Sequence, residues 1–282
     1  MLERLQLQRV SHINAIMDGY ADTVTHFRDR LGFQLNMEIP DSGDGTEACL
    51  MTLGPAMFEF FCPKERGERG QGRLLDRFGD HYIGVEYTVP DVAAARAYCE
   101  AHDVRIIRDP GGFFFTYPGN CLGISWELWD GNWLDPQPDL DRFEDVHPSA
   151  YWRDEHPLGV VGVARLSVAV SDLDAALGTF QAMIDAPLLG KVDRPAAAAT
   201  GAQLQVGDTV FELLTPTGDG AIADYLARYG ERIRSTVYRV GDLARAELHL
   251  SAQGFSLVPG DAEGTRAIPP EETKNLLFEF TE

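Results

Sequence analysis

The hydrophobic and polar residues of this chain show the same series of strand-like and helix-like patterns four times. Each occurrence opens with the alternation of a half-buried strand, continues with apolar residues at helical spacing and closes with short apolar strands between turns. In the first half, strands are predicted over residues 9–17, 33–39, 47–53, 56–62, 82–89, 104–108, 112–117 and 122–130, and helices over 21–31 and 92–102. A charged, glycine-rich loop over residues 64–73 separates the first two occurrences.

The second half repeats this order. Strands are predicted over residues 163–170, 188–192, 200–206, 209–215, 236–240 and 275–281, and helices over 172–184 and 243–253. Asp91 and Asp172 stand at the starts of two predicted helices, where an acidic capping residue is favoured. Residues 132–159, which contain several prolines and acids, interrupt the pattern and are predicted to link the two halves.

One glutamate marks each occurrence. Glu59, Glu127, Glu212 and Glu279 each stand between large apolar residues in a predicted strand. A carboxylate in such a strand costs free energy unless a cation or another partner compensates it. Four of them at regular intervals indicate a repeated structural unit with a repeated inward position.

The spacing tests the repeat. When the four units are aligned on their helices, His12, Gly84, Arg165 and Ser235 share one position in the opening strands. The glutamate follows that position by 47 residues from 12 to 59, by 43 from 84 to 127, by 47 from 165 to 212 and by 44 from 235 to 279. The alternation of long and short intervals predicts two halves, each an unequal pair of units.

Composition narrows the classes of partner. With 24 basic and 44 acidic side chains the formal net charge is −20, so a nucleic-acid partner is not expected. No apolar run approaches the roughly 18 residues that span a bilayer, and the first residues lack an apolar signal core, so we expect no membrane partner and a cytoplasmic protein. Four cysteines without CxxC spacing favour reduced thiols.

In these features the sequence resembles the vicinal oxygen chelate superfamily, the glyoxalase, bleomycin resistance and extradiol dioxygenase group. The resemblance rests on His12-Ile13 with Leu31-Gly32-Phe33, on Val89-Pro90-Asp91-Val92, on Val170-Ser171-Asp172-Leu173-Asp174 and on the four glutamates. Residues 118–128 are most similar to the corresponding ending in the methylmalonyl-CoA epimerase branch. The resemblance implies an α+β fold in which four βαβββ modules form two cup-shaped mixed sheets with helices on the convex side.

The implied domains follow the two halves. Residues 1–131 would form a metal-binding vicinal oxygen chelate domain, with modules at about 8–62 and 81–131. Residues 132–159 would be the linker, and residues 160–282 a degenerate domain without metal. In that second half Arg165 cannot lose its proton to become a ligand, and an Arg facing Glu212 is a natural substitute for a metal bond.

The resemblance also implies one divalent metal ion in the first cup, held by residues of the first and last strands of two modules. His12, Glu59 and Glu127 occupy such positions, whereas Gly84 has no side chain that could ligate. A neutral histidine with carboxylates suits Mn, Fe, Co, Ni or Zn and leaves positions for substrate oxygens.

His81 is the predicted fourth ligand, and Glu86 is its competitor. His81 precedes Glu127 by 46 residues, close to the long spacing, and a bulge or shifted register would bring it into the cup. Strict alternation argues against it, because positions 81 and 84 point to opposite faces. Glu86 shares the face of position 84 and is the competing candidate.

The predicted function is an isomerase, epimerase or lyase that stabilises an enolate or similar oxyanion on a small oxygenated substrate. Glu59 and Glu127 would be ligands and proton carriers. The residues expected to line the cup and bind substrate are Asn14, Met57, Phe61, Glu86, Ser125 and Trp129. One alternative is an iron-dependent extradiol-type dioxygenase, whose two histidines and one carboxylate would require His81. The other is a non-catalytic small-molecule binding protein.

Three further expectations concern residues outside the proposed ligands. The aromatic run Phe113-Phe114-Phe115 is expected to be core on one face and cup wall on the other. His102, His147 and His156 are expected in loops or at the surface. A homodimer is compatible with the sequence but not required, because each half already contains a pair of modules.

Overall fold

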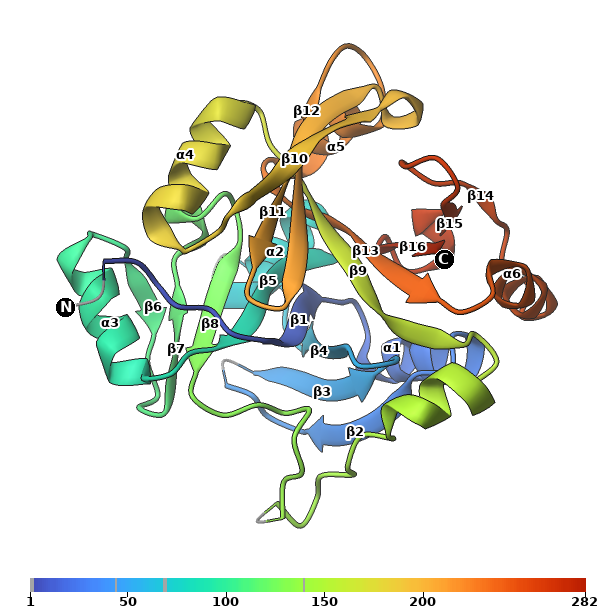
Figure 1. Ribbon diagram of the computed structural model, residues 1–282. Coiled ribbons are helices and arrows are strands. Elements are labelled where there is room, and N and C mark those ends of the chain that lie inside the picture. Colours follow the sequence, from blue (N-terminus) through green and yellow to red (C-terminus); the bar gives the residue numbers. More distant parts are fainter. Residues whose placement is uncertain (1–2, 44, 68–69, 139) are drawn as a thin grey trace. The chain divides into compact units, whose positions relative to one another are not determined.

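The computed structural model describes residues 3–43, 45–67, 70–138 and 140–282 (Figure 1). It contains two curled, mixed sheets of eight strands each. The strand order of the first is β2-β3-β4-β1-β5-β8-β7-β6, and that of the second is β10-β11-β12-β9-β13-β16-β15-β14. Both sheets thus have the same topology, which confirms the α+β fold of repeated βαβββ modules.

The chain divides into two compact units, of which one comprises Met1–Ser11, Ile83–Asn132 and Arg165–Arg234. Its elements, of which β5 and β9 begin in the other unit, are β5 (His81–Thr88), α3 (Val92–Ala101), β6 (Ile106–Arg108), β7 (Phe113–Thr116), η2 (Pro118–Asn120), β8 (Ser125–Trp129), β9 (Val160–Ala169), α4 (Leu173–Met183), β10 (Leu188–Arg194), η4 (Pro195–Ala197), β11 (Ala199–Val206), β12 (Thr209–Pro216) and α5 (Ala221–Tyr229). Its core is aromatic: the rings of Trp126, Phe180 and Phe211 lie 5.5 to 5.8 Å apart.

The other unit comprises His12–Tyr82, Trp133–Ala164 and Ser235–Glu282. Its elements, of which β1 and β13 begin in the first unit, are β1 (Val10–Ile16), α1 (Tyr20–Thr25), η1 (His26–Arg30), β2 (Gln34–Ile39), β3 (Thr46–Thr52), β4 (Met57–Pro63), α2 (Gly70–Phe78), η3 (Tyr151–Glu155), β13 (Arg232–Val240), α6 (Leu243–Ala252), β14 (Val258–Pro259), β15 (Arg266–Ile268), η5 (Pro270–Glu272) and β16 (Leu277–Thr281). Phe27 stacks on Phe60 at 4.4 Å, and Phe58 packs against Phe278 at 5.7 Å. Stacked and edge-on rings of this kind add to the free energy of apolar burial.

Aspartate caps begin three of the module helices. The carboxylates of Asp91, Asp172 and Asp242 each accept a hydrogen bond from the backbone N–H three residues later, at 3.0, 3.0 and 2.9 Å. Each satisfies an N–H group that the first turn of a helix leaves without an intrahelical partner. The caps expected at Asp91 and Asp172 are confirmed.

Two helices were not expected from the sequence. α2 begins at Gly70, inside the predicted loop 64–73, of which residues 68 and 69 lie outside the described residues. Glycine disfavours helix, so the pattern favoured a loop. Gly72 is nevertheless required, because a Cβ there would lie 2.3 Å from the carbonyl oxygen of Glu65. The second helix, α5, covers a stretch for which the sequence predicted no element.

Residues 144–147 run along the outer edge of β2, within the segment that leads from β8 to β9 (Figure 1). The Glu144 N–H donates to the Asn36 carbonyl at 2.8 Å, and the Asn36 side-chain amide donates to the Glu144 carbonyl at 2.7 Å. Further along, Trp152 and His156 are buried. His156 lies in the bend that follows η3, as expected for a loop residue, but it is buried and not at the surface. The role of residues 132–159 as a link between domains stays a prediction.

The side chain of His156 is buried as a neutral ring. Its Nε2 lies 3.1 Å from the Gly32 carbonyl, and its Nδ1 accepts a weak hydrogen bond from the Leu158 N–H at 3.4 Å. Burial lowers the pKa of His156 to about 4.

Among the described residues, no helix combines the length and apolar character needed to cross a membrane.

Candidate metal centre

The strand glutamates occupy the same register position in all four modules. Glu59 pairs with Asn14, Glu127 with Glu86, Glu212 with Ser167 and Glu279 with Val237. In each case the partner lies two residues after the repeat position at 12, 84, 165 or 235, and therefore on the same side of its strand. We call the side of each sheet that carries these glutamates the glutamate face.

In the second module, the first strand offers Glu86 as a possible metal ligand in place of a residue at the repeat position 84. A Cβ at Gly84 would lie 2.1 Å from the carbonyl oxygen of Ser125, so no side chain fits at that position. Glu86 follows two residues later and is the direct cross-strand partner of Glu127. The two glutamates are only 1% and 4% exposed. Like charges that face each other on neighbouring strands destabilise a sheet, so this pair favours a bound cation.

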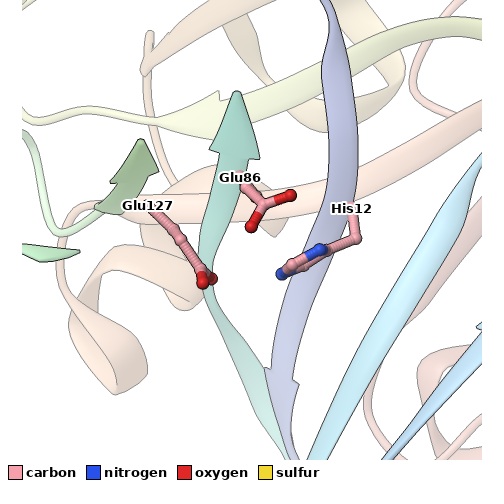
Figure 2. A group of neighbouring side chains, drawn as sticks. All are labelled: His12, Glu86 and Glu127. Carbon is pink, nitrogen blue, oxygen red and sulfur yellow. The ribbon is translucent and has the colours of Figure 1, made fainter. Parts of the chain in front are cut away.

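Glu86 and Glu127 form a three-residue group with His12 (Figure 2). Each offers one ligand atom, and these atoms all lie within 4.8 Å of one another. Figure 2 shows the imidazole and the two carboxylates turned toward a common point from three strands. Within the described part of the chain, this is the one group of three or more His, Cys, Asp or Glu residues with such spacing.

Glu59 contacts the same imidazole from β4. Its Oε2 lies 3.4 Å from Nε2 of His12, and the side chains are 11% and 2% exposed. Glu59 is not part of the three-residue group, although its carboxylate lies beside it. A carboxylate against the ring of a ligating histidine fixes the orientation of the ring and raises its basicity.

The structure places His81 at the start of β5, five residues before Glu86 and so on the opposite side of the strand by alternation. Its Nδ1 lies 2.7 Å from the carbonyl oxygen of Gly79, and its ring packs edge-on against Phe78. His81 is also not part of the three-residue group. These contacts favour Glu86 over His81 as the additional ligand.

The other expected site residues lie near the glutamates by register. Met57 pairs with His12, Phe61 pairs with Ile16, and Asn14 is the partner of Glu59. Ser125 is buried and its hydroxyl donates to the Thr116 carbonyl at 3.0 Å, so it is held in place by the neighbouring strand. Trp129 is half-buried at the end of β8.

The aromatic run is divided between the two sides of β7, as expected. Phe114 is fully buried, while Phe115 pairs with Glu127 and Phe113 with Trp129 on the glutamate face. Arg108 of β6, which the sequence did not single out, lies with its guanidinium 5.5 Å from the centre of the Phe115 ring. Only the pairing of the short strand β6 with β7 reveals this arginine.

In the second sheet, side-chain and backbone groups of the protein donate hydrogen bonds to both glutamates, Glu212 and Glu279. Glu212 accepts from Arg194 Nε at 3.0 Å and Nη2 at 2.5 Å, and from Gln203 Nε2 at 2.6 Å, with Arg165 Nε at 3.4 Å. Glu279 accepts from the Ser235 hydroxyl at 2.9 Å and the Asp261 N–H at 2.9 Å. These carboxylates are therefore already compensated.

The donor set of the first sheet fits a divalent cation. One imidazole nitrogen with two buried carboxylates supplies neutral and anionic ligands of the kind used by Mn, Fe, Co and Zn, and two carboxylates balance two positive charges. Three protein ligands leave positions for substrate oxygens. The geometry thus suits metal-assisted chemistry on an oxygenated small molecule.

No protein-family model matches the chain, and no curated protein sequence matches it significantly. Among solved structures, a mutant of 4-hydroxymandelate synthase from Streptomyces coelicolor has a TM-score of 0.75 and 15% identity, covering 97% of this chain and 92% of that chain. Methylmalonyl-CoA epimerase from Mycobacterium tuberculosis is 25% identical, with a TM-score of 0.41, over 43% of this chain and 87% of that chain. A methylmalonyl-CoA epimerase variant from S. coelicolor, in complex with 2-nitronate-propionyl-CoA, is 21% identical, with a TM-score of 0.39, over 43% and 96%.

The likeness to hydroxymandelate synthase over 97% of this chain shows that the two proteins share a fold. The fold implied by the sequence resemblance is therefore confirmed. The two epimerase structures each correspond to less than half of the chain.

Proposed function

We propose that the protein is a divalent-metal-dependent enzyme that transfers a proton on a small oxygenated substrate, as an isomerase, epimerase or lyase. The observation that carries the proposal is the buried group of His12, Glu86 and Glu127. These three side chains would hold the metal, with Glu59 against the His12 ring. When bound, the cation would supply Lewis-acid stabilisation of negative charge on a substrate oxygen.

Glu59 is the residue best placed to carry the proton. It is 9% exposed, more than Glu86 or Glu127, and its contact with His12 places it beside the proposed ligands. In the proposed reaction Glu59 removes a proton from the carbon next to the substrate's carbonyl group. An isomerase would return this proton from Glu59 to a neighbouring position, whereas an epimerase would need a second group to deliver a proton to the opposite side. Glu127, which the sequence offered for the same task, is proposed to act as a ligand.

The ligand set favours proton transfer over oxygen chemistry. A facial triad of two histidines and one carboxylate is typical of iron-dependent oxygenases. Here the group contains one histidine and two carboxylates, and the contact of His81 with the Gly79 carbonyl supports leaving it out. The Phe113, Phe115 and Trp129 side chains beside Glu127 would contact an apolar or aromatic part of the substrate.

The second half is proposed to hold no metal. Its glutamates are compensated by Arg194, Gln203 and Arg165 at Glu212, and by Ser235 and the Asp261 N–H at Glu279. We therefore expect at most one bound divalent ion for each chain, with residues 1–131 as the metal-binding domain.

Metal analysis of purified variants tests the ligand assignment. We expect the wild type to retain a divalent ion, and Glu86→Gln and Glu127→Gln to lose most of it, because Gln removes the charge and keeps the shape. His81→Asn is the matched control and should retain the wild-type content. Equal metal content in all four proteins would refute the proposed ligands.

Isotope exchange tests the reaction class. Proton transfer predicts incorporation of deuterium from D2O into 2-oxo or 2-hydroxy carbonyl compounds without oxygen uptake. Glu59→Gln should keep the metal and lose the exchange. Oxygen consumption dependent on iron would instead establish a dioxygenase, and ligand binding with neither exchange nor metal would establish a binding protein.

A further inference from the structure

The second sheet buries positive charge on its glutamate face. Arg165 of β9 stands at the repeat position that His12 occupies in the first module, and it is 8% exposed. Arg194 of β10 forms a two-point ion pair with Glu212, while Arg165 Nε lies 3.4 Å from the same carboxylate. Arg165, Arg194 and Glu212 belong to one compact unit.

The charges in this cluster do not balance. Two guanidinium groups face one carboxylate, so Arg165, Arg194 and Glu212 together carry one net positive charge. Gln203 also donates to Glu212, which further occupies the carboxylate without adding negative charge. A buried charge is costly unless a partner compensates it. The cluster therefore favours one additional negative charge.

Two buried polar atoms beside the cluster would gain from such a ligand. Among the described residues, Nη2 of Arg165 has no hydrogen-bond acceptor, and neither does the hydroxyl of Ser167 have a partner. Arg165 and Ser167 are two residues apart on β9 and so lie on the same side of the strand. Ser167 pairs with Glu212 across the sheet, which puts its side chain on the glutamate face.

We propose that Arg165, with Arg194 and Ser167 beside it, forms a binding site for a small organic monocarboxylate. A guanidinium presents parallel N–H donors that match the two oxygens of a carboxylate. A single negative charge balances the cluster, whereas a dianion would exceed it. The arginine side chains are 10% and 14% exposed. The site is independent of the metal proposed for the first sheet.

Fluoroacetate, followed by 19F NMR in low-salt buffer, is a suitable probe of the full-length protein as purified. We expect saturable binding by the wild type and at least a tenfold weaker affinity for Arg165→Gln, since a hydrogen bond to a charged group is removed. Glu127→Gln is the matched control for binding through the first sheet, and it should bind fluoroacetate as the wild type does. Ser167→Ala should weaken binding severalfold.

Several results would overturn the proposal: no saturable binding, equal affinity in Arg165→Gln, or loss of binding in Glu127→Gln. Displacement of fluoroacetate by chloride at the same concentration would show that the site binds anions without preference for a carboxylate, and it would overturn the proposal too. Should Arg165→Gln fail to fold by circular dichroism, Arg165→Lys takes its place. Lys keeps the charge but not the paired donors, so weakened binding supports the proposal and unchanged binding refutes it.

Discussion

Replacing Glu86 by Gln should change stability in opposite directions with and without metal. Glu86 and Glu127 are buried cross-strand partners whose ligand atoms lie within 4.8 Å of each other. At an effective dielectric constant of about 20, two unit charges at that separation repel by about 3.5 kcal/mol. The isosteric Gln removes one charge. In metal-free protein we therefore expect the free energy of unfolding to rise by about 1 to 3 kcal/mol.

With divalent metal present, the order should reverse. A cation that binds the native state stabilises it in proportion to its affinity, and Glu86→Gln loses that contribution. Urea unfolding of both proteins, in chelator and then in excess Mn²⁺, measures the four free energies. The exposed Glu263 provides a matched control, since Glu263→Gln makes the same change in net charge and should shift stability by less than about 0.5 kcal/mol. Destabilisation of the metal-free protein by Glu86→Gln would refute the like-charge reasoning.

Three further predictions concern stability. The lowered pKa of His156, about 4 against an ordinary 6.5, means that the unfolded chain binds a proton first as the pH falls, so unfolding free energy should drop by up to about 3 kcal/mol between pH 6.5 and 4; a His156→Gln variant that keeps the full wild-type dependence in urea titrations would contradict this. Gly84→Ala should cost about 1 to 3 kcal/mol or more, because its Cβ meets the Ser125 carbonyl, whereas Gly112→Ala meets nothing within 4 Å and should be near neutral by thermal unfolding. Asp172→Ala should lower unfolding free energy by about 1 kcal/mol through loss of its helix cap, and no change in the melting temperature would argue against the cap.

The sequence was informative wherever the fold repeats. The four glutamates and the capping aspartates depend on local spacing, and spacing is visible in the chain. The sequence named Glu86 only as the competitor of His81, because it could not show that Glu86 and Glu127 are direct cross-strand partners. That pairing joins strands about forty residues apart, and no local pattern records it.

Burial of Trp152 and His156, in a stretch that is otherwise mostly exposed among its described residues, was also beyond local pattern. His156 is buried because its ring meets the Gly32 carbonyl, a contact between segments far apart in the chain. α2 was missed because Gly70 and Gly72 have low helix propensity, while the tight contact at Gly72 selects glycine for a reason that only the packed structure shows. Tertiary contacts override propensity at both places.

The two hydrogen bonds between Glu144 and Asn36, one of which is donated by the Asn36 side chain, have a consequence for self-association. β2 is the last strand of the first sheet on its side, and an edge strand with open N–H and C=O groups invites another chain to add a strand. Here the chain's own residues take up part of that edge in a non-strand conformation. The sheet is thereby protected from growth past β2, and any dimer built by strand addition has to form along a different edge.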